Sequence, residues 1–119
     1  YISLHQSQLY PGTGLKSEKN CLNYSLPSQT GPDVYLDTLK KAIDKLTGFN
    51  PDLAAVSMGF DTYKLDPIAS LSLEKGTYRQ IGQMLSGLGK PMFSVLEGGY
   101  NTTDLPECIY QYLTGVSKL

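Results

Sequence analysis

Histidine and cysteine are scarce in this chain: its 119 residues include one histidine, His5, and two cysteines, Cys21 and Cys108. Two cysteines so far apart form neither a CxxC redox pair nor a zinc knuckle. A single disulfide between them is possible, but a reduced, intracellular setting is the favoured interpretation. With so little histidine, the composition excludes most of the acid–base and metal chemistry that a self-sufficient chain performs.

An excess of charge of one sign is also absent, because 10 Lys and Arg residues stand against 11 Asp and Glu residues, for a net charge of −1. This balance excludes the electrostatic footprint of a protein that binds nucleic acid or an anionic membrane surface. No apolar run approaches the ~20 residues of a membrane span, and no signal-peptide pattern opens the chain. We therefore expect a cytoplasmic protein, or a nuclear one if it is eukaryotic, with no direct nucleic-acid partner and no membrane partner.

What the sequence does have is a regular alternation of apolar patterns. The expected elements are a strand at 1–5, a long loop at 6–31, a helix at 33–47, a strand at 53–58, a helix at 75–88, a strand at 92–96 and a helix at 104–113. Asp33 suits the N-cap of the first helix and Gly48 its left-handed C-cap, while Gly115 is expected to close the last helix. The continuous apolar runs at 53–58 and 92–96 are typical of strands buried on both faces.

Strands that alternate with helices predict right-handed βαβ units. The predicted fold class is therefore α/β, with a parallel sheet covered by helices on both faces, and residues 1–119 form part of one domain. No internal repeat marks a second domain. Because the chain opens inside a strand, at Tyr1, we expect it to be a piece of something longer.

Two of the predicted strands end in sequences suited to chemistry, and ligands of open parallel sheets bind beyond such carboxyl ends. Asp61 comes directly off one strand, with Gly59 allowing close backbone packing, and Tyr100 follows the Gly98-Gly99 pair after another. A fixed carboxylate can hold a divalent metal, and a phenol can donate a hydrogen bond to an oxyanion. The simpler interpretation is that Asp61 caps a turn and that the glycines form an ordinary loop.

Four motifs in one order carry a family resemblance, and they cover essentially the whole chain: Tyr1-Ile2-Ser3-Leu4-His5, Tyr10-Pro11-Gly12-Thr13-Gly14, Gly59-Phe60-Asp61 with Asp66-Pro67, and Leu96-Glu97-Gly98-Gly99-Tyr100-Asn101. The chain resembles the C-terminal part of the histone deacetylase family, which includes acetylpolyamine amidohydrolases and acetoin-utilisation proteins. The implied architecture is an incomplete, three-layer arginase/deacetylase-like fold. The sequence motifs around Glu97 and Thr62 are similar to those of bacterial, archaeal and class II-like members.

The resemblance also implies a role for each matching residue. Asp61 matches a ligand of the catalytic zinc, and Tyr100 matches the catalytic tyrosine that polarises the amide carbonyl and stabilises the tetrahedral intermediate. Residues that match the acyl-lysine channel or the pocket floor are Leu9, Tyr10, Ile68, Gly98 and Gly99. Ser3 and Leu4 match positions that help to bind a monovalent cation, K⁺ in this interpretation, and Asp66 supports the loop that carries Asp61.

The implied activity is zinc-dependent hydrolysis of an N-acetyl amide, in an acetylated protein or a small acetylated amine. The family's site needs three histidines, and His5, which matches none of them, is interpreted as structural. The chain alone is therefore expected to be inactive, with the missing N-terminal part of its own domain as its partner. Two alternatives stay open: a catalytically inactive structural fragment or scaffold, and a nucleotide-binding doubly wound domain.

Overall fold

The computed structural model describes residues 1–117. In chain order, its elements are β1 (Ile2–Gln6), β2 (Leu22–Leu26), α1 (Pro32–Phe49), β3 (Ala54–Met58), α2 (Lys75–Ser86), β4 (Met92–Leu96) and α3 (Leu105–Ser117). Six of these seven elements match the segments expected from the apolar pattern. The strand β2 and the last residue of β1, Gln6, lie inside the stretch predicted to be a long loop, so that prediction is wrong for six of its residues.

The strand β2, which the sequence did not predict, is stabilised by pairing with β1. It is surrounded by residues typical of turns, but it pairs with β1 in a parallel register that places Ile2 opposite Leu22 and Gln6 opposite Leu26. Its last residue, Leu26, is buried in the core. A strand of five residues in a polar stretch gives a weak periodic signal, because partners distant in sequence supply its hydrogen bonds.

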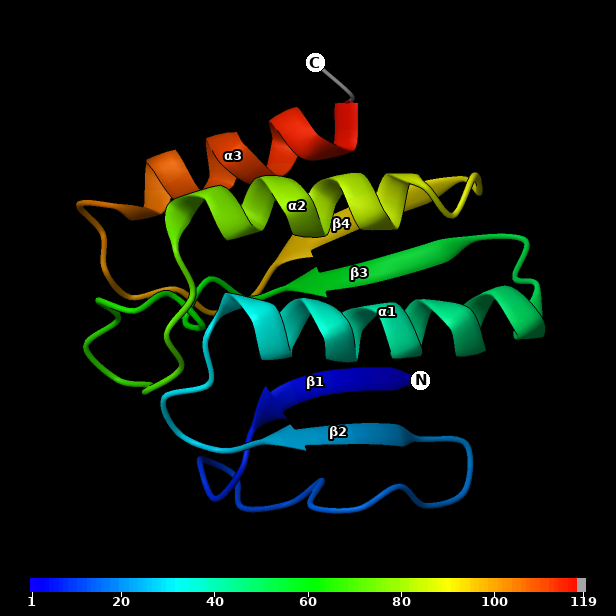
Figure 1. The fold of residues 1–119 in the computed structure, drawn as a ribbon, viewed down its shortest axis with the longest axis horizontal. Coiled ribbons are helices and arrows are strands. Elements are labelled where there is room, and N and C mark those ends of the chain that lie inside the picture. The colour runs from blue at the N-terminus through cyan, green and yellow to red at the C-terminus, as the bar shows by residue number, and fades with distance from the viewer. Residues whose placement is uncertain (118–119) are drawn as a thin grey trace.

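The four strands form two parallel pairs, β1–β2 and β3–β4. Figure 1 shows all four strands running in the same direction, with β1 and β3 as the inner members of the two pairs. Within residues 1–117 no ladder joins β1 to β3. The α/β class with parallel strands is as predicted, but the described chain holds two strand pairs where one continuous sheet was expected.

The strands β3 and β4 are not buried on both faces, which corrects the expectation drawn from their apolar sequences. Met58 is buried, whereas Ala55 and Ser57 are exposed and Phe93 and Val95 are each 50% exposed. Side chains alternate between the faces of a strand. Val56 and Met58 of β3 therefore face the core, whereas Ser94 and Leu96 of β4 are exposed like Phe93 and Val95, so residues 1–117 leave much of β4 uncovered.

The helices α2 and α3 cross at two glycines. A Cβ on Gly82 would collide with the backbone of α3, and a Cβ on Gly115 would collide with the Arg79 carbonyl of α2. Gly115 therefore lies inside α3 and makes a close approach, contrary to the prediction that it closes the helix. The predicted caps of α1 are also wrong, because Gly31 is the N-cap and left-handed Asn50 is the C-cap.

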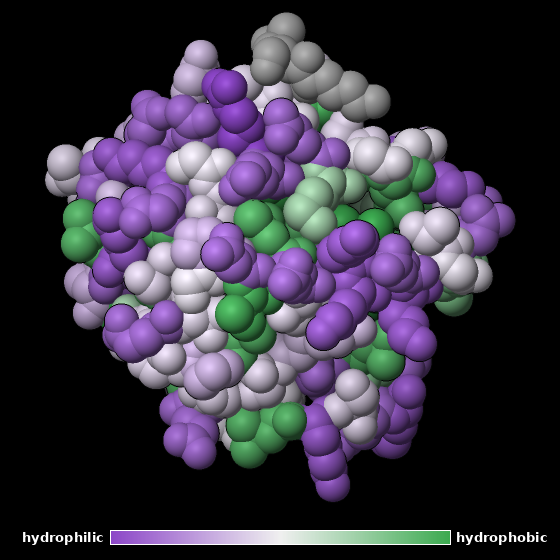
Figure 2. Space-filling view, in the orientation of Figure 1, coloured by the Kyte–Doolittle hydropathy of each residue, from purple (hydrophilic) through white to green (hydrophobic). Residues whose placement is uncertain are grey.

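The core between the helices and the strands is rich in aromatic residues. Its buried apolar members are Leu26, Tyr35, Leu39, Met58, Phe60, Tyr63, Leu71, Leu73, Tyr78, Ile81, Cys108 and Tyr112. The outer face of the helices is polar with scattered apolar residues (Figure 2). Cys21 and Cys108 are both free thiols. No helix among the described residues has the length and apolar character needed to cross a bilayer.

Candidate active site

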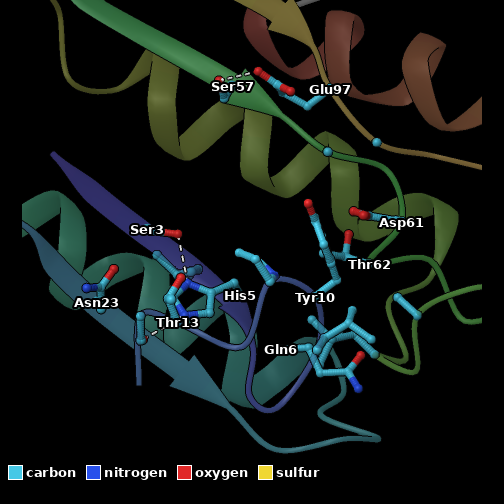
Figure 3. Close-up of a pocket in the computed structure, with 18 of the residues that line it drawn as sticks. Ser3, His5, Gln6, Tyr10, Thr13, Asn23, Ser57, Asp61, Thr62 and Glu97 are labelled. Atoms are coloured by element: carbon cyan, nitrogen blue, oxygen red, sulfur yellow. Dashed lines mark hydrogen bonds between the residues drawn. The ribbon is translucent and has the colours of Figure 1, made fainter. Parts of the chain in front are cut away.

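A cavity of about 830 Å³ lies between the two strand pairs, lined by residues of β1, of the loop that follows it, and of the segments just after β3 and β4. The predicted site residues that line it are Ser3, Leu4, Leu9, Tyr10, Asp61 and Gly98. Figure 3 shows Tyr10 and Asp61 reaching the same part of this cavity from different segments. The fold thus brings together six residues from four separate places in the sequence.

The carboxylate of Asp61 lies in a cradle made by two glycines. A Cβ on Gly98 would lie 2.5 Å from Asp61 Oδ2, and a Cβ on Gly59 would lie 2.9 Å from Asp61 Oδ1. Gly98 has no positive φ, so what this position requires is room and not backbone freedom. The two glycines allow the carboxylate to sit against the backbone at the ends of β3 and β4, at the edge of the cavity.

Burial raises the pKa of the Asp61 carboxyl above its ordinary value, and the nearby Asp66 carboxylate raises it further, while a hydrogen bond from its own backbone N–H lowers it in part. The same environment acts on Tyr35, whose buried phenol also borders the cavity. Burial, with the charge of Asp61, raises the pKa of Tyr35 to about 12. A partly desolvated carboxylate without a cationic partner gains from binding a cation.

We expect Asp61→Asn to raise the thermal unfolding midpoint of the metal-free protein by a few degrees at pH 7. Because the pKa of Asp61 is raised, the folded state binds the proton more tightly than the unfolded state does. The stability that this proton contributes to the wild-type protein is fully present below the ordinary pKa of the carboxyl and is lost as the pH rises through the folded-state pKa. The asparagine has no such titration. Thermal unfolding of the wild type and of Asp61→Asn at several pH values tests this. The difference between their unfolding midpoints should shrink as the pH falls, and a difference independent of pH contradicts the prediction.

Four further predicted residues lie outside the cavity lining: Asp66, Ile68, Gly99 and Tyr100. Buried Asp66 connects them, because its Oδ1 accepts the backbone N–H groups of Ile68 and Ala69 at 2.8 and 2.9 Å, and its Oδ2 accepts the N–H of Tyr100 at 2.9 Å. The side chain of Tyr100 is 49% exposed. Asp66 therefore holds the turn that carries Tyr100 against the loop after Asp61.

Gly99 gives that turn its shape. Its φ of +136° is a conformation that residues with a side chain rarely adopt, and a Cβ there would lie 2.9 Å from the Cβ of Phe60. Gly98 and Gly99 differ in this respect, because Gly99 has a positive φ and Gly98 does not. The paired glycines thus do different work: Gly98 makes room for Asp61, and Gly99 turns the chain toward Tyr100.

The only histidine of the chain connects β1 to the loop that follows it. His5 Nδ1 lies 2.8 Å from Ser3 Oγ, and His5 Nε2 lies 2.8 Å from the carbonyl oxygen of Gly14. Both ring nitrogens are therefore engaged. The structural role expected for His5 stays a prediction.

Several residues that line the cavity have no role predicted from the sequence, among them Tyr35, Ser57, Thr62 and Glu97. Ser57 donates a hydrogen bond to Glu97 Oε1 at 3.0 Å, which joins the carboxyl ends of β3 and β4 (Figure 3). Two features of the sequence could have indicated these residues: Ser57 is the one polar residue in an apolar strand, and Glu97 comes directly before the paired glycines.

The residues present do not fit a complete zinc site. Catalytic zinc takes three protein ligands, and residues 1–117 contain no group of three His, Cys, Asp or Glu side chains arranged to hold a metal ion. Asp61 suits one ligand position, because its carboxylate is partly desolvated and its pKa shift involves no hydrogen bond from another side chain. A complete set of three ligands would therefore need at least one residue from outside 1–117.

A family model described as the histone deacetylase domain matches residues 1–116. Acetylpolyamine amidohydrolase 1 of Pseudomonas aeruginosa is 37% identical over 78 residues, covering 66% of this chain and 22% of that protein. Histone deacetylase 14, chloroplastic, of Arabidopsis thaliana is 33% identical over 123 aligned residues, covering 92% and 29%. A probable deacetylase of Methanothermobacter thermautotrophicus is 34% identical over 126 aligned residues, covering 98% and 38%.

Solved structures agree on the fold. An acetylpolyamine aminohydrolase from Burkholderia pseudomallei matches with a TM-score of 0.90 at 24% identity, over 97% of this chain and 36% of that one. The histone deacetylase Clr3 matches with a TM-score of 0.88 at 29% identity, over 100% of this chain and 23% of that one. These similarities confirm the predicted α/β fold of the deacetylase type. The chain spans only 22–38% of the length of the three curated relatives.

Proposed function

The chain belongs to the histone deacetylase family, and from this membership we propose that the longer protein containing it hydrolyses N-acetyl amides with the help of zinc. The substrate is acetyl-lysine in a protein or a small acetylated amine, in keeping with the names of the relatives. The observation that carries the proposal is the Asp61 carboxylate, held between two glycines at the edge of a cavity that Tyr10 also lines.

In this proposal Asp61 is one zinc ligand, and the remaining ligands come from outside residues 1–117. Zinc, when bound, polarises a carbonyl and lowers the pKa of a water molecule. Asp61 contributes a carboxylate that is already partly withdrawn from solvent, so less reorganisation is needed when it binds a cation. Ser3 and Leu4, on the other side of the cavity, contribute oxygen atoms to a K⁺ site.

Tyr100 donates a phenolic hydrogen bond to the oxyanion that develops as the amide is attacked. Its backbone is fixed by Asp66 and its turn by Gly99, which leaves the half-exposed side chain free to reach a bound substrate. Leu9, Tyr10 and Ile68 offer apolar surface to the acyl-lysine chain. Tyr10 and Ile68 are exposed, at 95% and 61%, so this surface is available.

The missing N-terminal part of the domain is the proposed partner of this chain. The inner strands of the two pairs run in the same direction, and no ladder joins them within the described residues. Such edges present unpaired backbone groups that accept a further strand. A parallel strand inserted between β1 and β3 would join the pairs into one sheet, occupy the part of the cavity between these strands, and bring additional ligands to the part beside Asp61.

A second function is favoured for the chain on its own, because its described residues lack a three-ligand metal site. Taken alone, the chain is then a structural fragment or scaffold without catalytic activity. The family membership favours both of these functions over a nucleotide-binding domain.

Acetate release by the full-length protein tests the proposed function. We expect release from acetyl-lysine peptides or from N-acetylated polyamines, and the preferred class identifies the substrate. Residues 1–119 assayed in parallel should release none. Absence of acetate release from every substrate of both classes, by folded and zinc-loaded full-length protein, would refute the proposal.

We expect Asp66→Asn to lower kcat of the full-length protein by about 10-fold, since one lost or reversed hydrogen bond to a positioned backbone group costs about 1–3 kcal/mol. The amide keeps one oxygen as an acceptor but offers N–H groups where the other oxygen stood, so Asp66 can no longer hold both Tyr100 and the loop at Ile68. Steady-state kinetics measures the loss. An Asn variant with wild-type kcat contradicts the role assigned to Asp66.

A further inference from the structure

The loop that carries Tyr10 crosses the polar side of the β1–β2 pair without strand pairing of its own over residues 9–17. Tyr10 itself is 95% exposed, so its own packing does not fix its position. The loop is nevertheless drawn against the strands at two points, Gly14 and Lys16, by hydrogen bonds from side chains of β1 and β2. The position of the Tyr10 side chain in the cavity therefore depends on these connections.

His5 makes the first connection, and its chemistry fixes the direction of each hydrogen bond. The carbonyl oxygen of Gly14 can only accept, so the hydrogen of the imidazole is on Nε2. In that tautomer Nδ1 has a free lone pair and accepts the hydroxyl hydrogen of Ser3. Ser3 thus orients the ring, and the ring holds Gly14. The lone pairs of Ser3 Oγ stay free for the cation proposed to bind there.

Gly14 is shaped for this contact. Its φ of +74° lies in the left-handed region, and a Cβ would lie 2.9 Å from both Cε1 and Nε2 of His5. The backbone can approach the imidazole this closely only because residue 14 has no side chain. The histidine and the glycine are therefore one fitted pair, and neither is explained by core packing alone.

The second connection lies one strand away. Asn23 of β2 donates from Nδ2 to the carbonyl oxygen of Lys16 at 3.1 Å, and its backbone N–H donates to Ser17 Oγ at 3.0 Å. It holds the far end of the loop, whereas His5 holds the end that is nearer to Tyr10. Without His5, the hydrogen bonds of residues 9–14 within the described part of the chain would be reduced to the internal one from Gly12 N–H to the Leu9 carbonyl.

We propose that His5 is a positioning residue that, oriented by Ser3, holds Gly14 and thereby places Tyr10 in the substrate channel. The inference deepens the proposed function and rests on it for the identity of the channel. In this role His5, which also lines the cavity, acts through Gly14 and the loop and needs no contact with substrate or metal. Its contribution is to substrate binding, because it limits the freedom of the wall that Tyr10 provides.

Three variants of the full-length protein test the proposal. His5→Phe removes both hydrogen bonds, His5→Asn offers a group near the position of Nδ1 but is too short to reach Gly14, and His5→Gln can place an N–H near the position of Nε2. The control is Ser94→Ala, which removes a hydrogen bond of 2.7 Å to Tyr112 away from the cavity. Steady-state kinetics and deuterium uptake by residues 9–17 are measured for each folded variant.

For His5→Phe and His5→Asn we expect KM to rise about 10-fold with kcat within about 2-fold, as the loss of one hydrogen bond in a binding wall predicts. Deuterium uptake by residues 9–17 rises in the same two variants. His5→Gln restores KM to within about 3-fold of wild type and restores protection, and Ser94→Ala changes neither. A purely structural role would lower stability without this division between KM and kcat and without rescue by glutamine.

Unchanged uptake and unchanged KM in His5→Phe and His5→Asn would overturn the proposal, as would equal changes in all three His5 variants. The uptake measurement also separates this proposal from the proposed function. If the wild-type protein released no acetate, faster exchange in His5→Phe and its rescue in His5→Gln would still demonstrate the connection to Gly14. Equal exchange in all variants would refute that connection independently of catalysis.

Discussion

Replacing Tyr100 with phenylalanine is expected to lower kcat of the full-length protein by about 10²- to 10³-fold, with little change in KM. One hydrogen-bond donor to a developing oxyanion contributes a factor of this size, and the contribution is made in the transition state and not in substrate binding. The phenylalanine keeps the ring and removes only the hydroxyl group. Because the backbone of Tyr100 is held by Asp66, the turn should keep its place in the variant.

The matched control is Tyr110→Phe, which removes the hydroxyl of a tyrosine on α3 that is 60% exposed. This variant should retain wild-type kcat and KM. Thermal unfolding of both variants should match that of the wild type, so that the kinetic difference reports chemistry and not folding. A Tyr100→Phe enzyme with wild-type kcat would contradict the assignment of Tyr100 as the oxyanion donor.

Asp61→Ala is expected to lower kcat/KM of the full-length protein by about 10³-fold or more and to weaken zinc binding. The metal stabilises transition-state charge by several kcal/mol, and about 4 kcal/mol corresponds to a factor of about 10³. The alanine also leaves an empty space in the cradle formed by Gly59 and Gly98. Asp61→Asn should show a similar loss of activity, because a neutral amide is a poor substitute for the carboxylate.

Metal content and kinetics measured on the same preparations test this prediction. The control is Asp37→Asn, which neutralises an exposed carboxylate on α1 and should change neither property. Retention of both zinc and wild-type kcat/KM by Asp61→Ala would contradict the assignment of Asp61 as a zinc ligand. Loss of activity with undiminished zinc affinity would show that Asp61 acts on the substrate and does not bind the metal.

Helix periodicity predicts much of this fold, because each helix buries a stripe of its own residues. The helix predicted at 33–47 rests on one such stripe and occurs as Pro32–Phe49. The strand β2 could not be predicted in the same way, since it is stabilised by pairing with β1. The exposure of Phe93 and Val95 is equally invisible in the sequence, because an apolar strand sequence does not reveal what covers it.

The site is predictable where a backbone constraint marks it. Gly98 and Gly99 stand out because paired glycines allow backbone geometry that is closed to larger residues, and Asp61 stands out because it follows a strand at the edge where ligands bind. The structure gives each of the two glycines a distinct task. The contact of His5 with Gly14 and the hydrogen bond between Ser57 and Glu97 join separate segments, and no local pattern encodes such contacts.

The most direct test of the central claim is titration of the metal-free full-length protein with zinc, with acetate release as the readout. We predict that activity is absent without metal, rises linearly with added zinc and reaches a plateau at about one equivalent per chain, as one catalytic zinc site requires. We expect no activation of Asp61→Ala over the same range. Full acetate release by protein freed of metal, or release that does not depend on zinc, would contradict the claim.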